Sequence, residues 1–131
     1  VAKNLDMKHV MIVHGDDGLD EISICSETIV SELKDNKISE YKISPKDYGL
    51  NVSSFDQIAA NSSYESFLLV NSAFNGESSA VQDMIALNSG AALYVASVVN
   101  SISDGVEMAF DCMNNGQAAQ KLADYVRVSN E

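Results

Sequence analysis

The first third of the chain has the apolar pattern of β-strands. Residues 9–15, HVMIVHG, form a β-branched apolar run that a glycine stops, which is typical of a strand buried on both faces. Residues 28–33 and 37–43 carry spaced apolar positions on either side of a turn in which Asp35-Asn36 supplies the turn chemistry. We therefore expect one buried strand followed by an antiparallel hairpin.

A short turn separates these strands from the helical part of the chain. Ser44 can cap this turn, Pro45 suits its first helical position, and Gly49 ends it. Beyond residue 53 the spacing of apolar residues becomes helical. The pattern predicts an α/β fold, with strands and a hairpin in the first third and a helical cluster in the rest.

Three serines mark the starts of predicted helices. Ser62, Ser79 and Ser101 are each followed three residues later by Glu, Gln or Asp, which is the spacing of a helix-capping box. The first helix should end near Asn75, where Gly76 stops it, and the third should close at residues 114–116. The second helix should extend to about residue 99, and a fourth should run from residue 117 to about 128.

Apolar residues within these helices give the predicted core. The second helix is apolar nearly all round, so we expect it to be central rather than superficial. Other core positions are assigned by helical spacing; they are the methionines, Phe67, Val70, Phe74, Phe110 and, on one stripe of the last helix, Ala118, Leu122, Tyr125 and Val126.

Composition is that of an ordinary folded domain. The chain has 131 residues, of which 46% are hydrophobic and 21% charged, enough for one domain or a large part of one. No apolar run reaches the roughly 18–20 residues that a membrane helix needs. The opening VAKNLDMKH is neither a signal nor a transit peptide, and we expect it to be the cut end of a longer chain.

Cys25 and Cys112 lie far apart in the sequence, without a CxxC motif or a neighbouring histidine cluster. Neither a zinc site nor a disulfide framework is indicated. We interpret both as reduced, buried thiols of a cytoplasmic protein.

The charge of the chain excludes one class of partner. A formal net charge of −11 argues against nucleic acid, whose binding depends on Lys and Arg side chains that neutralise phosphates. From residue 47 to residue 120 there is no Lys or Arg at all. Any phosphate ligand of this region must be held by backbone amides, by a bridging cation or by residues outside this chain.

The segment VMIVHGDDGLDEIS, residues 10–23, carries the candidate chemistry. A predicted strand leads into an acidic loop in which Asp20 and Glu21 are adjacent, and such carboxylates are hard oxygen ligands suited to Mg²⁺. Because neighbouring side chains of a regular strand point to opposite faces, both can serve one ion only where the backbone turns. Gly18 permits such a turn. The alternative is a solvated surface turn without a ligand.

No catalytic residue is assigned from the sequence. His14 stands at a predicted strand end, where packing or hydrogen bonding is a commoner role than acid or base chemistry, and His9 is expected to be exposed. Ser23, Ser26 and Thr28 have no base at a recognisable spacing, so a nucleophilic triad is not indicated.

Three segments together resemble the anthranilate phosphoribosyltransferase family. They are VMIVHGDDGLDEIS, then, after the strand pair, EYKISPKDYGL, and then ALNSGAALYVA, and their order and spacing match the family over nearly the whole chain. The most specific part is HGxDGLDE. The resemblance implies a fold similar to that of pyrimidine nucleoside phosphorylases, with residues 1–131 forming the C-terminal part of the glycosyltransferase-type catalytic α/β domain.

The resemblance also implies a function. The family transfers the phosphoribosyl group of phosphoribosyl diphosphate to anthranilate and releases pyrophosphate, a step of tryptophan biosynthesis. In this chain Asp20 and Glu21 would correspond to the pair that helps to hold Mg²⁺ on the diphosphate. The parent enzyme is expected to be a cytoplasmic homodimer, with no nucleic-acid or membrane partner.

The chain also departs from the family pattern. The glycine-rich GTGGD loop, the basic and asparagine-containing loops and the arginine that contacts anthranilate are missing, and we expect them upstream of Val1. Residues 57–70, QIAANSSYESFLLV, lack the family's usual glycine- and asparagine-containing stretch. Because groups that position the substrates are missing, we expect the chain alone to be inactive.

Two other interpretations stay open at this point. One is a pyrimidine nucleoside phosphorylase relative, in which the DGLDE core would be unexpected. The other is a non-catalytic acidic module that binds a protein partner through its helices. The module predicts that alanine at both Asp20 and Glu21 leaves its function unchanged, whereas changes on an exposed helical stripe abolish it.

Overall fold

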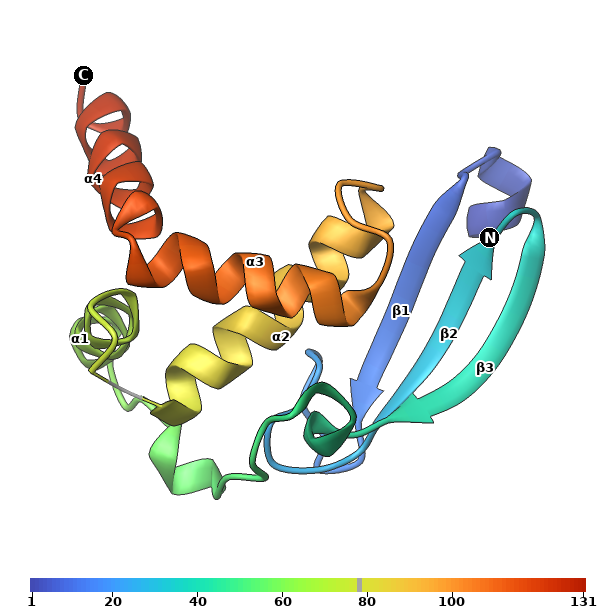
Figure 1. Cartoon of the computed structure of the whole chain (residues 1–131), viewed down its shortest axis with the longest axis horizontal. Helices are drawn as coiled ribbons and strands as arrows, with labels where there is room; N and C mark the ends of the chain where they lie inside the picture. The colour runs from blue at the N-terminus through green and yellow to red at the C-terminus, as the bar shows by residue number, and fades with distance from the viewer. Residues whose placement is uncertain (78) are drawn as a thin grey trace.

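The computed structural model describes residues 1–77 and 79–131. Within them, a three-stranded antiparallel sheet of order β1-β2-β3 is followed by four α-helices (Figure 1). The predicted α/β class, with strands first and helices after, is confirmed. The elements are η1 (Ala2–Leu5), β1 (His9–Gly15), β2 (Thr28–Lys34), β3 (Lys37–Ile43), η2 (Pro45–Tyr48), η3 (Phe55–Gln57), α1 (Ser63–Phe74), α2 (Ser79–Val95), α3 (Ile102–Asn114) and α4 (Gln117–Ser129).

The predicted hairpin is present with the predicted turn. Lys34 of β2 pairs with Lys37 of β3, so the loop contains only two residues. Asp35 and Asn36 have φ angles of 48° and 61°. Positive φ at both central residues is the signature of the tight turn that matches the twist of a hairpin, and Asp and Asn tolerate it better than most residues.

The α-helices cover one face of the sheet, and the other face is largely open apart from Leu33, which is 5% exposed and lines a small pocket together with Val1 and Ala2. Val30 and Ile43 point into the core beneath the helices and are buried. The opposite face carries Ile12, Ile29 and Ile38, and Ile12 and Ile38 are 64% and 63% exposed. The prediction that residues 9–15 are buried on both faces is therefore wrong for this chain, because α1–α4 all lie on one side of the sheet and leave Ile12 of β1 exposed on the other (Figure 1).

The second helix is central, as predicted, but shorter than expected. Ala86, Leu87 and Ala91 of α2 are buried in the core. α2 ends at Val95 rather than near residue 99. Ser97 adopts a left-handed φ of 58°, and the N–H of Val98 donates to the carbonyl of Leu93 at 3.0 Å, the bonding pattern that closes many helices.

Helices α2 and α3 cross at a pair of glycines. A Cβ atom on Gly105 would overlap the carbonyl oxygen of Gly90 and lie 2.8 Å from its Cα atom. A Cβ atom on Gly90 would lie 2.7 Å from the backbone nitrogen of Val106. The two backbones are thus in direct contact, and the absence of side chains at both positions sets the distance between the helices.

Two of the predicted serine caps are confirmed. The Ser62 hydroxyl accepts a hydrogen bond from the N–H of Glu65, and that of Ser101 accepts one from the N–H of Asp104, each at 3.1 Å. The cap expected at Ser79 lies outside the described residues, since the side chain of Ser79 and the residue before it are not described.

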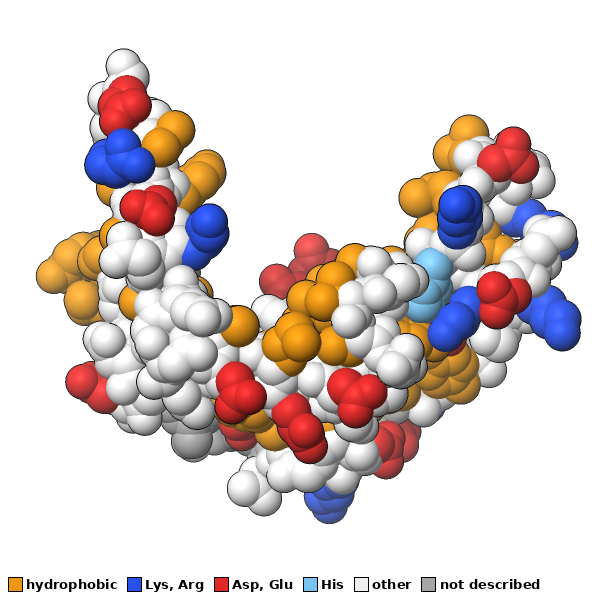
Figure 2. Space-filling view, turned by 45° about the horizontal axis from the view of Figure 1, so that its top comes forward, with side chains coloured by type: hydrophobic (Ala, Val, Ile, Leu, Met, Phe, Trp, Pro, Cys, Tyr) orange, Lys and Arg blue, Asp and Glu red, His pale blue; other side chains and the backbone are white. Residues whose placement is uncertain are grey.

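The predicted core is right for the central helices and wrong for parts of the outer ones. Met113 is buried, and Phe74 and Phe110 pack against the core. Phe67 of α1 and Tyr125 of α4, by contrast, are 52% and 69% exposed. Helical spacing identifies an apolar face but does not tell whether another element covers it, and α4 projects away from the body (Figures 1 and 2). The methionines Met7 and Met108 are also exposed.

Two further expectations concern the chain as a whole. Cys25 and Cys112 are free and only partly buried, so they are less enclosed than expected. In residues 1–77 and 79–131, no helix combines the length and the apolar character that a membrane span requires.

Candidate metal centre

The acidic loop, residues 16–27, connects β1 to β2 and closes on itself at its base. The N–H of Asp16 donates to the carbonyl of Glu27 at 2.8 Å, and the N–H of Gly15 donates to the carbonyl of Leu19 at 2.9 Å. Gly18, which directly precedes Leu19, has a φ of 93°, a conformation that residues with L side chains rarely adopt. The backbone therefore reverses directly after the strand, as the candidate site requires.

The carboxylate of Asp17, an exposed residue, makes hydrogen bonds across this loop. It accepts hydrogen bonds from the N–H of Leu19 at 3.2 Å and from the hydroxyl of Ser23, which is fully buried. Desolvation raises the pKa of Asp17, but the hydrogen bonds from Ser23, Leu19 and Ser26 outweigh it, so the pKa lies below its ordinary value. Asp17 and Ser23 thus have a structural role in the loop.

Asp20 and Glu21 lie on the outside of the loop. The backbone bends at both positions, and both residues are exposed. Across the part of the chain that the structure describes, neither carboxylate takes part in a hydrogen bond or an ion pair, whereas the carboxylate of Asp16 lies 2.6 Å from the Lys42 ammonium. Two adjacent carboxylates are therefore free to bind a ligand from solvent.

The chemistry of this pair fits an open Mg²⁺ site. Among residues 1–77 and 79–131, no group of three or more His, Cys, Asp or Glu side chains is placed to hold a metal ion. In such a site, Asp20 and Glu21 would provide one or two carboxylate ligands, and water and substrate oxygens would complete the shell. Mg²⁺ is commonly bound in this way, by one or two carboxylates together with substrate phosphates.

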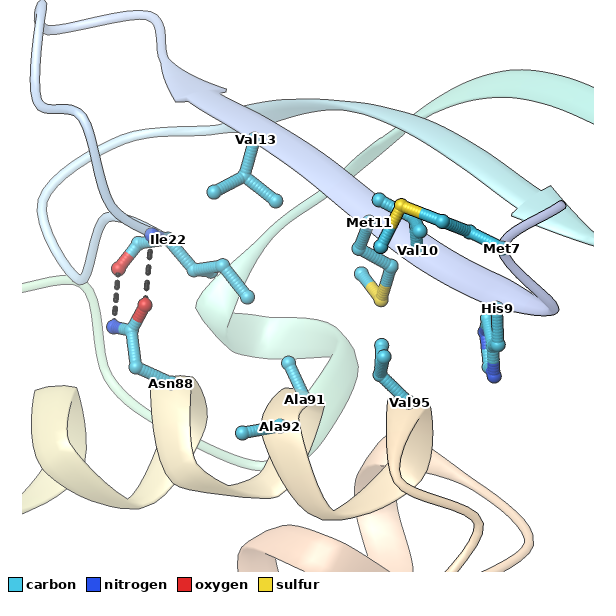
Figure 3. Close-up of a pocket in the computed structure, with 10 residues that line it drawn as sticks. All are labelled: Met7, His9, Val10, Met11, Val13, Ile22, Asn88, Ala91, Ala92 and Val95. Atoms are coloured by element: carbon cyan, nitrogen blue, oxygen red, sulfur yellow. Dashed lines mark hydrogen bonds between the residues drawn. The ribbon is translucent and has the colours of Figure 1, made fainter. Parts of the chain in front are cut away.

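A side chain from α2 holds the backbone next to the pair. Asn88 accepts a hydrogen bond from the N–H of Ile22 at 3.0 Å and donates one to the carbonyl of Ile22 at 2.9 Å (Figure 3). Both residues lie at one end of an apolar groove of about 330 Å³ between β1 and α2, which Met11 and Ala91 also line. The loop is thereby joined to the central helix.

Comparison with known proteins gives the family of the chain. The family model described as "Glycosyl transferase family, a/b domain" matches residues 1–119. The chain belongs to this glycosyl transferase family. A curated relative, the anthranilate phosphoribosyltransferase of Vesicomyosocius okutanii, is 46% identical over 129 residues, which cover 98% of this chain and 38% of the relative. The match lies in the C-terminal portion of such relatives.

Solved structures of this family share the fold. The anthranilate phosphoribosyltransferase of Thermus thermophilus is 28% identical with a TM-score of 0.81, covering 91% of this chain and 35% of that one. The Saccharomyces cerevisiae enzyme, solved in complex with PRPP and Mg, is 20% identical with a TM-score of 0.78, covering 92% and 35%. The chain spans about 38% of the length of the curated relative from Vesicomyosocius okutanii and 35% of each of these two solved chains.

Glu32 is a buried carboxylate that the sequence analysis did not single out. It is only 7% exposed, and it accepts hydrogen bonds from the His9 ring and the Tyr41 hydroxyl, both at 2.7 Å. His9 was expected to be exposed, which is wrong, because its ring packs edge-on against Tyr94 of α2 with centroids 4.7 Å apart. The signal was available: Glu32 falls on the same face of β2 as Val30.

The Glu32 carboxylate should make stability depend on pH. Desolvation raises its pKa, but the hydrogen bonds from Tyr41 and His9 outweigh it, so the folded-state pKa lies below the ordinary value of 4.5. Because the folded-state pKa is depressed, the ionised Glu32 carboxylate stabilises the fold above pH 4.5. This stabilisation is lost as the pH falls through the folded-state pKa. Glu32→Gln should therefore lower stability at pH 7 by about 2 kcal/mol, typical of hydrogen bonds to a charged group.

Urea unfolding between pH 3 and pH 7 measures this effect. The stability difference between the wild-type chain and Glu32→Gln should shrink as the pH falls below about 4.5. Glu40→Gln is the matched control, because Glu40 is an exposed residue of β3, and it should change stability by less than about 0.5 kcal/mol. A difference that stays constant across this range would contradict the assignment.

The remaining candidates have no visible chemical role. His14 is exposed at the end of β1, and among the described residues its ring makes no hydrogen bond, so the expected packing or hydrogen-bonding role is not seen. Ser26 and Thr28 make hydrogen bonds within the loop: the N–H of Ser23 donates to the Thr28 hydroxyl at 2.9 Å, and that of Asp17 to the Ser26 hydroxyl at 3.3 Å.

Proposed function

We propose that this chain is the C-terminal part of the catalytic α/β domain of an anthranilate phosphoribosyltransferase. In this proposal Asp20 and Glu21 bind Mg²⁺ and thereby hold the diphosphate of phosphoribosyl diphosphate. The observation that carries the proposal is the exposed carboxylate pair on a bent, internally braced loop. We further propose a cytoplasmic, homodimeric parent that binds neither nucleic acid nor membranes.

The relatives support the choice of substrates. The curated relative from Vesicomyosocius okutanii is named for transfer to anthranilate, and the Saccharomyces cerevisiae enzyme was solved with PRPP and Mg. The charge of the chain supports the role of the cation, since residues 47–120 contain no Lys or Arg that could hold a polyanion directly. A cation at the pair supplies positive charge where pyrophosphate develops negative charge.

The part played by this chain is to position the cation. Gly15, Gly18 and Asp17 set the reversal of the backbone, and the pair that follows presents two carboxylates to solvent. Groups that orient the two substrates, which contribute a large share of such rate enhancements, would come from the rest of the parent. We therefore expect the chain by itself to bind the cation and to show no turnover.

The test is binding of Mn²⁺, a paramagnetic substitute for Mg²⁺, to the 131-residue chain. Titration should broaden the backbone amide NMR signals of Asp20 and Glu21 in a saturable way, because two carboxylates retain the ion close to them. The double substitution of Asp20→Asn with Glu21→Gln should remove the saturable broadening there.

Asp16→Asn is the matched control for this titration. Asp16 lies in the same loop, but its carboxylate is already paired with Lys42. Its removal should leave the broadening at Asp20 and Glu21 in place. Broadening that persists in the double variant, or that centres on other carboxylates, would argue against the proposed metal site.

A further inference from the structure

The peptide group between Glu21 and Ile22 is fixed by a residue 66 positions away in the sequence. Asn88 of α2 bonds to both backbone polar groups of Ile22, at 3.0 Å to the N–H and 2.9 Å to the carbonyl (Figure 3). A backbone segment paired in this way has little freedom to rotate. The peptide that follows Glu21 is therefore oriented by the central helix.

The orientation of the Asn88 carboxamide is itself determined. One N–H of its Nδ2 group donates to Ile22, and the group also donates to the carbonyl of Met84, one turn earlier in α2, at 3.1 Å. Its Oδ1 atom accepts from Ile22. A flipped amide would place a donor against the Ile22 N–H and an acceptor against the two carbonyls, so only one orientation satisfies all three bonds. Ile22 is 2% exposed, which keeps water from competing.

The other end of the segment is also anchored. The N–H of Leu19 donates to the Asp17 carboxylate at 3.2 Å, and the carbonyl of Leu19 accepts from the N–H of Gly15 at 2.9 Å. Asp20 and Glu21 are thus the two residues between a point fixed by the loop and a point fixed by α2. Their side chains are free while their backbone is held on both sides.

We infer that Asn88 is a positioning residue for the carboxylate pair: it sets the backbone from which Glu21 extends and so brings both carboxylates to one cation. This inference rests on the proposed function. Residues that orient metal ligands without touching the metal typically contribute about 10–100-fold to metal affinity. An arrangement held before the cation arrives lowers the entropy lost on binding.

The alternative role of Asn88 is only to join α2 to the loop, without an effect on the cation. Gln82, a second amide side chain on the same helix, provides a control that distinguishes this role from positioning of the pair. Gln82 donates to the carbonyl of Ala73 at 2.9 Å and to the Asn114 side chain at 3.1 Å, away from the acidic loop. Gln82→Ala therefore removes comparable hydrogen bonds from α2 without touching the pair. It should reduce the melting temperature and leave Mn²⁺ affinity unchanged.

The experiment follows the apparent Mn²⁺ affinity through the broadening of the Asp20 and Glu21 amide signals, together with the melting temperature of each variant. Asn88→Ala should weaken the affinity by about 10-fold. Asn88→Asp retains the acceptor for the Ile22 N–H but loses both donors, and it adds negative charge near the pair. Charge alone would tighten cation binding, whereas a positioning role predicts weaker binding in this variant too.

A triple variant tests whether Asn88 acts through the pair. In a chain that already carries Asp20→Asn and Glu21→Gln, Asn88→Ala should cause no further change in broadening. If the wild-type chain binds Mn²⁺ at the pair and both Asn88 variants bind it equally well, the inference is wrong and the proposed function stands. If the wild-type chain shows no saturable broadening at Asp20 and Glu21, both the proposed metal site and this inference are wrong.

Discussion

Gly105→Ala should lower the free energy of unfolding by about 3 kcal/mol, at the upper end of the usual cost of overpacking. The added methyl group would overlap the carbonyl oxygen of Gly90, and backbone atoms cannot move aside as the end of a long side chain can. Relief requires α2 and α3 to separate, which disturbs the core around Leu87 and Val106. Urea unfolding followed by circular dichroism measures the loss.

The direction in which Gly105→Ala changes the free energy of unfolding tests whether the two helices are in contact at their glycines. Replacing glycine by alanine inside an open helix stabilises it by roughly 0.5–1 kcal/mol. Unchanged or increased stability in Gly105→Ala would therefore contradict the crossing of α2 and α3 at their glycines. Glu107→Ala, at an exposed position of α3, is the control and should change stability by less than about 0.5 kcal/mol.

Features determined by neighbouring residues could be predicted from the sequence. The Asp35-Asn36 turn and the Ser62 and Ser101 caps each depend on a backbone conformation and a hydrogen bond within a few residues. The bend of the backbone at Asp20 and Glu21 could be predicted for the same reason, since Gly18 permits a turn beside them, whereas their role as metal ligands was implied by the family resemblance and stays a prediction.

Features that depend on distant contacts could not be predicted. Asn88 meets Ile22 across 66 positions, and His9 meets Glu32 across 23, so no local pattern pairs them. The same limit explains Phe67, whose helical spacing is correct while its side chain is 52% exposed. Spacing shows which residues share a face, and only the tertiary structure shows what lies against that face.

The largest functional effect should be seen when the chain is joined to the rest of an enzyme. In a chimera, this chain would replace the matching C-terminal part of the Vesicomyosocius okutanii enzyme, to which it is 46% identical. Asp20→Asn together with Glu21→Gln should then lower kcat/KM for phosphoribosyl diphosphate by about 100-fold, a typical loss when a group that stabilises developing charge is removed.

Two controls accompany the chimera. Asp16→Asn should change kcat/KM by less than about 3-fold, which is under about 1 kcal/mol of transition-state stabilisation, because Asp16 pairs with Lys42 rather than with the cation. The isolated chain, assayed with both substrates and Mg²⁺, should show no turnover, since the proposed function assigns the groups that position the substrates to the rest of the parent.

The most direct measurement is the initial rate of the chimera as a function of Mg²⁺ concentration, with and without the two carboxylates. The intact chimera should reach saturation with Mg²⁺, and the variant lacking both charges should need a markedly higher concentration or fail to saturate. An unchanged Mg²⁺ dependence in that variant would show that another part of the enzyme holds the cation and that the bent acidic loop does not.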